Sequence, residues 1–220
     1  MDRNLGATSA TPGDVGALGL LYQWGRKDPF LGSSSIRYES MAEAKSTITW
    51  PSAVSSDPSN GTIAYAIANP STFIACNDSN YDWYCTGSSS TDNTRWTASD
   101  KAKSIYDPCP SGWRVPDGGI TGVWAKAKGS SSAFHYSLTD RGLNFSGKFG
   151  SDQTIWYPAS GTRSSSDGSL CRVGDDGCYC SASTDSYYAY FLTFHDYGTV
   201  YPSNKSTTRA VGKSVRCLQE

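Results

Sequence analysis

The cysteines are the residues of this chain that could most readily do chemistry. Seven in 220 residues are many for a protein kept in a reducing compartment, which favours an oxidising one. The count is odd, so at least one thiol stays free or pairs between chains. The closest pair, Cys178 and Cys180, is a poor disulfide because residues two apart on a strand lie side by side without closing easily. The seven are Cys76, Cys85, Cys109, Cys171, Cys178, Cys180 and Cys217.

Other catalytic and metal-binding patterns are missing from the sequence. His135 and His195 have no neighbours at the spacing of a structural zinc site. There is no nucleophile elbow, zinc-protease, phosphate-loop or dinucleotide motif, and Asp175-Asp176 falls in a glycine-rich turn typical of a solvated loop. The sequence therefore predicts no catalytic residue, no metal and no cofactor. A cysteine-dependent oxidase stays open as an alternative, since it needs only that Cys178 and Cys180 be exposed and reactive.

A binding surface is the stronger prediction, and it comes from residues 187–201. Strand alternation places two sets of side chains on opposite faces. The set predicted to lie in the core contains Tyr188, Tyr190, Leu192 and Phe194. The other set combines tyrosines with small polar groups, a composition typical of antibody combining sites: Tyr187, Ala189, Phe191, Thr193 and His195, continued by Asp196, Tyr197, Thr199 and Tyr201. The alternative is a strand buried on both of its faces.

The composition of the chain indicates the type of domain that must position these residues. The chain has 22 Gly, 14 Tyr and 7 Trp with 18% charged residues and a net charge of −1, which indicates a strand-rich domain with many loops. Near-neutral charge without a basic block argues against nucleic acid as a partner. No apolar run is long enough to span a bilayer, so direct membrane insertion is not expected.

The elements follow from turn signals and periodicity. Residues 52–93 are predicted to form long surface excursions anchored by aromatic side chains such as Phe73 and Trp83. Helices are expected at 97–105 and 120–128. The remainder has the rhythm of a β-meander, with strands expected at 134–138, 143–145, 154–158, 178–183, 187–194, 199–201 and 215–218.

Four ordered motifs spread over the chain carry a resemblance to a known family. They are DRNLGA at 2–7, GLLYQWGR at 19–26, YDPCPSGWRVP at 106–116 and SVRC at 214–217. Together they resemble the Fibrobacter succinogenes major paralogous domain family of surface proteins from Bacteroidota and their phages. The resemblance implies an α+β, C-type-lectin-like fold of the formylglycine-generating-enzyme subtype, with about two helices packed on twisted antiparallel sheets between long irregular excursions. It implies one domain over residues 1–220, the C-terminal part of a longer protein.

A second resemblance concerns residues 171–209. The strings GCYCS at 177–181, AYFLTF at 189–194 and VYPSN at 200–204, followed by Arg209, look like the variable region of proteins diversified by a diversity-generating retroelement. Template adenines are randomised in such proteins, and Arg172, Cys178, His195 and Asp196 fit that outcome. Relatives tend to have a Tyr-Tyr-Trp pattern where this chain has Cys178-Tyr179-Cys180.

The resemblance also bears on the cysteines. Cys109 and Cys217 lie in its two strongest motifs, so they are expected to pair if the compartment is oxidising, and Cys76 with Cys85 could close a short loop. The alternative is that all are free thiols, as in a phage protein assembled in the cytoplasm.

These observations predict a non-enzymatic ligand-recognition domain on a bacterial cell surface, pilus tip or phage tail fibre. Its partner would be a protein or glycan ligand on a cell surface. The competing interpretation is a structural or assembly domain of a surface lipoprotein or pilus tip. The predicted ligand-binding residues are Arg172, Cys178, Cys180, Tyr187, Phe191, Thr193, His195, Asp196, Tyr197, Thr199 and Tyr201.

Overall fold

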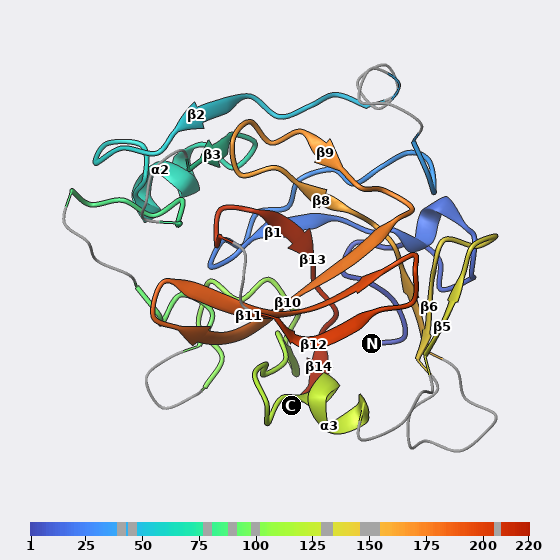
Figure 1. The fold of residues 1–220 in the computed structure, drawn as a ribbon. Helices are drawn as coiled ribbons and strands as arrows, with labels where there is room; N and C mark the ends of the chain where they lie inside the picture. The colour runs from blue at the N-terminus through green and yellow to red at the C-terminus, as the bar shows by residue number, and fades with distance from the viewer. Residues whose placement is uncertain are drawn as a thin grey trace.

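The computed structural model describes residues 1–38, 43, 48–76, 81–87, 92–97, 102–128, 134–145, 155–204 and 208–220. Within them the protein is a mixed α+β structure in which strands predominate (Figure 1). The helical elements are short: the 3₁₀ turn η1 at Val15–Ala17, α2 at Ile63–Ala68 and α3 at Val123–Lys128. Thr62 caps α2, its hydroxyl accepting from the backbone N–H of Tyr65.

The largest sheet has seven strands, in the order β12-β11-β10-β13-β8-β9, with β1 also pairing β13. The β10–β13 pairing is parallel, with Tyr179 opposite Ser214, and the other pairings between described strands of this sheet are antiparallel. The strands are β1 (Leu21–Gln23), β8 (Thr162–Arg163), β9 (Leu170–Cys171), β10 (Asp176–Asp185), β11 (Tyr188–His195), β12 (Val200–Asn204) and β13 (Gly212–Ser214).

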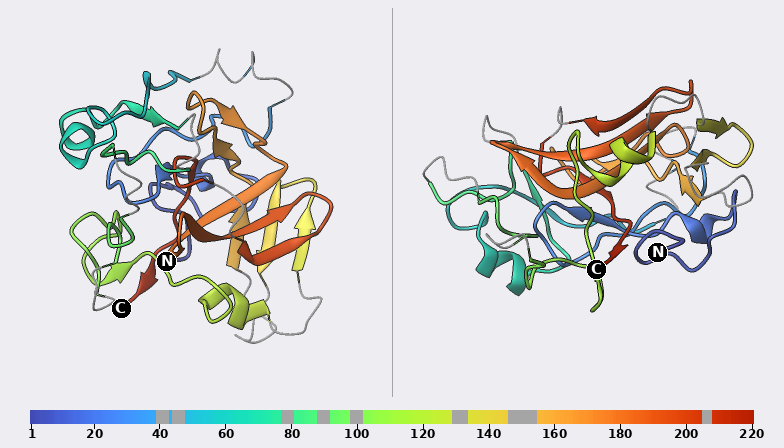
Figure 2. Two further views of the ribbon diagram at one scale, coloured as in Figure 1. Left: turned by 60° about the vertical axis from the view of Figure 1, so that its left-hand side comes forward. Right: turned by 90° about the horizontal axis from the view of Figure 1, so that it is seen from below.

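Smaller sheets surround this one. An antiparallel meander is formed by β5 (Phe134–Ser137), β6 (Gly142–Phe145) and β7 (Ile155–Pro158). A parallel pair is formed by β2 (Ala53–Ser55) and β3 (Phe73–Ala75), and an antiparallel pair by β4 (Trp113–Arg114) and β14 (Leu218–Gln219). Figure 2 shows both chain ends close together, and the Met1 ammonium donates to the carbonyl of Cys217 at 2.8 Å.

The long hairpin β10–β11 is covered on both of its faces. On one face, Tyr179, Leu192 and Phe194 pack with Trp124 of α3 and with aromatic side chains of β6 and β7. On the other, Cys180 and Ala182 pack in a cluster that includes Trp24, Trp96 and Val115. Each covering segment is far away in sequence, so the hairpin lies at the centre of the core.

Most predicted strands of the C-terminal half are confirmed with shifted ends, but not the last one. The strand predicted at 215–218 is wrong: residues 215–217 lie between β13, which ends at Ser214, and β14, which begins at Leu218, and Val215 and Cys217 pack in the core. The excursion predicted at 52–93 contains β2, α2 and β3, and its anchors Phe73 and Trp83 are buried as expected.

The two helix predictions have different outcomes. The helix expected at 120–128 begins later, at Val123, because Gly119 takes a positive φ of 77° in the turn before it, and Ile120 is left 88% exposed. The prediction of a helix at 97–105 is wrong, because Thr97 and Lys103 form an antiparallel bridge. Residues 98–101, which fall between them, lie outside the described residues. The Lys103 ammonium binds the carbonyls of Cys109, Pro110 and Trp113, which fixes the segment in a non-helical path.

Candidate functional site

The predicted binding residues follow the hairpin β10–β11 and its continuation into β12, but they do not form one surface. Tyr187 lies in the turn between β10 and β11, whereas His195 ends β11. The ten-residue strand β10 separates these ends by about 30 Å at the usual rise per residue. The single face expected from alternation is therefore divided between two ends of the hairpin.

Four of the predicted binding residues lie in the core rather than on a binding face. Phe191 is opposite Cys180 and Thr193 is opposite Cys178 in the β10–β11 register, and all four side chains are buried. The predicted core face is confirmed for Leu192 and Phe194, which fill the opposite cluster, whereas Tyr188 and Tyr190 are only half-buried. The surface prediction for these four is wrong because other parts of the core cover their face as well: Cys180 packs in the cluster of Trp24 and Trp96, and the Lys213 ammonium lies over the Phe191 ring.

Burial also determines the chemistry of the two thiols. It raises the pKa of the Cys178 thiol above its ordinary value and that of Cys180 to about 12. The Cys178 sulfur lies 3.4 Å from the Thr193 hydroxyl. Both cysteines are thus protonated and shielded from solvent at neutral pH, the opposite of what a reactive cysteine pair requires.

A group of side chains gathers where β11 ends and β12 begins, with exposed residues around the half-buried His195 and the buried Asp176. We call it the strand-end cluster: Arg172, Asp176, His195, Tyr197 and Tyr201. Nδ1 of His195 lies 2.7 Å from the carboxylate of Asp176, which also forms an ion pair with Arg172 at 3.4 Å. The His195 ring stacks on Tyr197 at 4.9 Å with an interplanar angle of 8°, and Tyr201 meets it edge-on at 6.1 Å. Tyr197 and Tyr201 are 70% and 48% exposed.

The backbone beneath this cluster is held in an unusual conformation. Arg172 has a positive φ of 56°, which a side chain larger than glycine rarely adopts. Its carbonyl accepts from the N–H groups of Asp175 and Asp176, and the carbonyl of Gly174 accepts from the Tyr136 hydroxyl at 2.6 Å. Burial raises the pKa of Tyr136 to about 12. Hydrogen bonds therefore fix the turn that presents Arg172.

The remaining predicted residues flank the cluster or lie away from it. Asp196 and Thr199 are half-buried in the turn between β11 and β12, where the N–H of His195 donates to the carbonyl of Thr199 at 3.0 Å. Tyr187 is 47% exposed at the other end of the hairpin.

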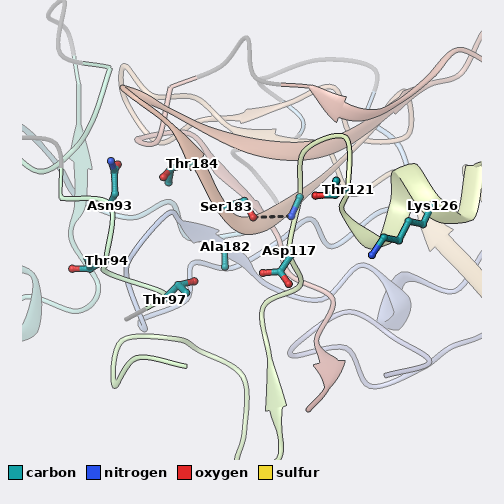
Figure 3. A pocket seen from close by; sticks show the side chains of 10 residues that line it. Asn93, Thr94, Thr97, Asp117, Thr121, Lys126, Ala182, Ser183 and Thr184 are labelled. Carbon is teal, nitrogen blue, oxygen red and sulfur yellow. Dashed lines mark hydrogen bonds between the residues drawn. The ribbon is translucent and has the colours of Figure 1, made fainter. Parts of the chain in front are cut away.

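A polar pocket of about 490 Å³ lies at that other end, beside the last residues of β10 (Figure 3). Its walls come from the segments 93–97, 117–126 and 182–184. The backbone N–H of Gly118 donates to the Ser183 hydroxyl at 3.0 Å and joins two of these segments. Sequence reasoning missed this pocket because no local motif marks a cavity whose walls are brought together by the fold.

Two pairing expectations for the cysteines are resolved by the structure. Cys109 and Cys217 form a disulfide with 5.9 Å between their Cα atoms, as the resemblance implied. Cys76 and Cys85 are not joined to each other. Cys76 is buried against Trp83 in a separate cluster, so packing rather than a cross-link fixes its position.

No protein-family model, curated protein or solved structure matches this chain. In the described part of the chain, no three His, Cys, Asp or Glu side chains are placed to share a metal ion. No helix among the described residues is long and apolar enough to cross a bilayer.

Proposed function

We propose that this protein is a non-enzymatic ligand-recognition domain, whose C-terminal β segment presents a binding surface that can be diversified. The strand-end cluster carries the proposal. Its tyrosines expose large aromatic area, while the contact between Asp176 and His195 holds the supporting ring in place. Rigid tyrosines surrounded by adaptable polar groups give contact area at a low entropy cost, as in antibody combining sites.

The proposed architecture is a C-type-lectin-like fold resembling the Fibrobacter succinogenes major paralogous domain family. It is supported by short helices beside a twisted, largely antiparallel sheet with long excursions between. The four motifs that carry the resemblance also come together in space. The N–H of Leu5 donates to the carbonyl of Val215, and Cys109 is cross-linked to Cys217.

Location and partner follow as parts of the same proposal. The protein contains a disulfide between Cys109 and Cys217, and disulfides are typical of proteins in oxidising compartments. We place the domain on a bacterial surface, a pilus tip or a phage tail fibre, with a protein or glycan on a cell surface as its ligand. Burial of both Cys178 and Cys180 favours this function over a cysteine-dependent oxidase.

Deep sequencing of this locus in its source population tests the proposal. We expect amino-acid differences to gather at the exposed codons of the segment, Tyr187, Tyr197 and Tyr201 above all, and at adenines of a nearby template copy. The buried residues Leu192 and Phe194 should stay unchanged. Exposed residues outside the segment, Ile120 and Leu138, give the background rate. Differences spread evenly over both exposed sets would overturn the proposal and favour a structural or assembly domain.

A further inference from the structure

The polar pocket beside β10 has the lining of a site for a hydroxyl-rich ligand. Three segments contribute threonine, serine and asparagine side chains, with Ala182 between them, and none of the lining residues is aromatic. Its volume of about 490 Å³ falls in the range usual for small-molecule sites. The lining residues are Asn93, Thr94, Thr97, Asp117, Gly118, Thr121, Lys126, Ala182, Ser183 and Thr184.

Several of these polar groups have hydrogen-bonding capacity left for a ligand. Oδ1 of Asn93 accepts from Arg209, which leaves the two amide hydrogens of Asn93 to donate. The Ser183 hydroxyl accepts from Gly118 and retains its own hydrogen. The hydroxyls of Thr121 and Thr184 make no hydrogen bond within the described part of the protein. Sugar hydroxyls, which both donate and accept, match this set.

The pocket lining holds one carboxylate, Asp117, and one ammonium group, Lys126. The Asp117 carboxylate is balanced by Arg114, whose two N–H groups reach it at 3.1 and 2.8 Å. Lys126 projects from α3 toward the loop that carries Asp117 (Figure 3) and has no ion-pair partner among the described residues. An ammonium group beside neutral donors is suited to a carboxylate on the ligand.

The walls of the pocket are also held in place before any ligand arrives. Arg209 is fully buried and fixes Asn93, while the Gly118–Ser183 hydrogen bond fixes the opposite wall. Fixed polar groups lose little entropy on binding, which raises affinity for a ligand of matching shape.

We propose that this pocket binds a carboxylated sugar, with Lys126 pairing the carboxylate and the surrounding hydroxyl and amide groups bonding the sugar hydroxyls. The sugar could be free or form the end of a glycan, since both present the same groups. The inference does not rest on the proposed function, because the pocket and the strand-end cluster lie at opposite ends of β10.

Titration calorimetry on the full chain tests the proposal with glucuronate and N-acetylneuraminate, with oligosaccharides that end in these sugars, and with neutral glucose. We expect saturable binding of an acid sugar with Kd of about 1 mM or tighter, about −4 kcal/mol. Lys126→Gln should weaken binding at least about tenfold. Thr184→Val should weaken it by a smaller factor, because that substitution removes one hydroxyl and keeps the shape.

Two control variants show whether acid-sugar binding belongs to this pocket. Lys27→Gln removes an exposed lysine away from the pocket, and Tyr201→Ala alters the strand-end cluster; neither should change acid-sugar binding. Binding only by the oligosaccharides, lost in Lys126→Gln, would support the proposal and identify a glycan end as the source. Failure of every acid sugar to bind, equal binding of glucose, or full binding by Lys126→Gln would each overturn it. Since Tyr201→Ala reports on the other end of the hairpin, these outcomes are independent of the proposed function.

Discussion

Arg209 donates a guanidinium N–H to Oδ1 of Asn93 at 2.5 Å and so connects the C-terminal segment to the wall of the polar pocket. The same nitrogen donates to the carbonyl of Ser186 in the turn between β10 and β11 at 2.7 Å. A second nitrogen lies 3.5 Å from the Asp82 carboxylate, which also pairs with Arg95. One buried cation thereby positions the hairpin turn and one wall of the pocket together.

Replacing Arg209 should therefore destabilise the protein and disturb both places. Arg209→Met keeps the aliphatic stem but removes the hydrogen bonds to Asn93 and Ser186 and one of the two cations beside the buried Asp82 carboxylate. Hydrogen bonds that involve a charged group contribute about 1.5–3 kcal/mol each, so we expect a loss of about 3 kcal/mol in urea unfolding. Arg3→Met, at an exposed arginine paired with Asp2, is the control and should change stability by less than about 0.5 kcal/mol. Equal effects of the two variants would contradict the role assigned to Arg209.

The disulfide between Cys109 and Cys217 should be a major source of stability. It closes a loop with a sequence separation of 108, and cross-links of this length stabilise by about 2–5 kcal/mol. We expect that loss in urea unfolding when the protein is reduced, and a similar one in the double variant Cys109→Ala, Cys217→Ala. Adding reductant should not affect the double variant further. A wild-type protein insensitive to reductant would contradict the prediction.

The C-terminal hairpins could be predicted from the sequence because their signals are local. Alternation from Tyr188 to Phe194 gave both the strand and the two sets of side chains, with Leu192 and Phe194 in the core as expected. Exposed residues near the turns, such as Tyr197 and Tyr201, were placed correctly for the same reason. The family resemblance alone led to the pairing of Cys109 with Cys217.

Properties that depend on distant segments could not be predicted. Phe191 is buried beneath Lys213 of β13, and no periodicity in 187–195 predicts that contact. The helix expected at 97–105 is replaced by contacts of Lys103 with the loop at 109–113. The polar pocket was missed for the same reason, since Ser183 and Gly118 meet only in the folded chain.

Phe191 and Tyr201, predicted on the same face, should respond very differently to truncation. Phe191 is 3% exposed and lies under the Lys213 ammonium, 4.9 Å from the ring centre. Phe191→Ala should cost about 3–5 kcal/mol in urea unfolding, whereas Tyr201→Ala should stay within about 0.5 kcal/mol. Small effects from both substitutions would mean that the inner face of the hairpin is open to solvent.

The thiols of Cys178 and Cys180 should resist alkylation in the folded protein. Their raised pKa values keep them protonated at neutral pH, and burial denies access to the reagent. Treatment with iodoacetamide followed by peptide mass spectrometry should modify the partly exposed Cys85 and Cys171 first. In urea all four should react at similar rates. Rapid modification of Cys178 or Cys180 in the native state would contradict their burial and restore the oxidase alternative.

Stability should fall in alkali, and Cys180 should account for part of the fall. The unfolded thiol loses its proton near 9.0, whereas the folded one keeps it up to about 12. Between these values the folded state binds more protons than the unfolded state, so the free energy of unfolding decreases as pH rises, by at most about 1.4 kcal/mol per pH unit for one group. Burial also raises the pKa of Tyr179, which causes a further decrease in the free energy of unfolding that begins at higher pH, near the ordinary tyrosine value of 10.0.

Urea unfolding at about pH 8 and about pH 10 should therefore show a smaller loss of stability for Cys180→Ala than for the wild type. The contribution of Tyr179 is common to both proteins and cancels in the comparison, so identical losses would show that Cys180 ionises as readily in the folded protein as in the unfolded chain.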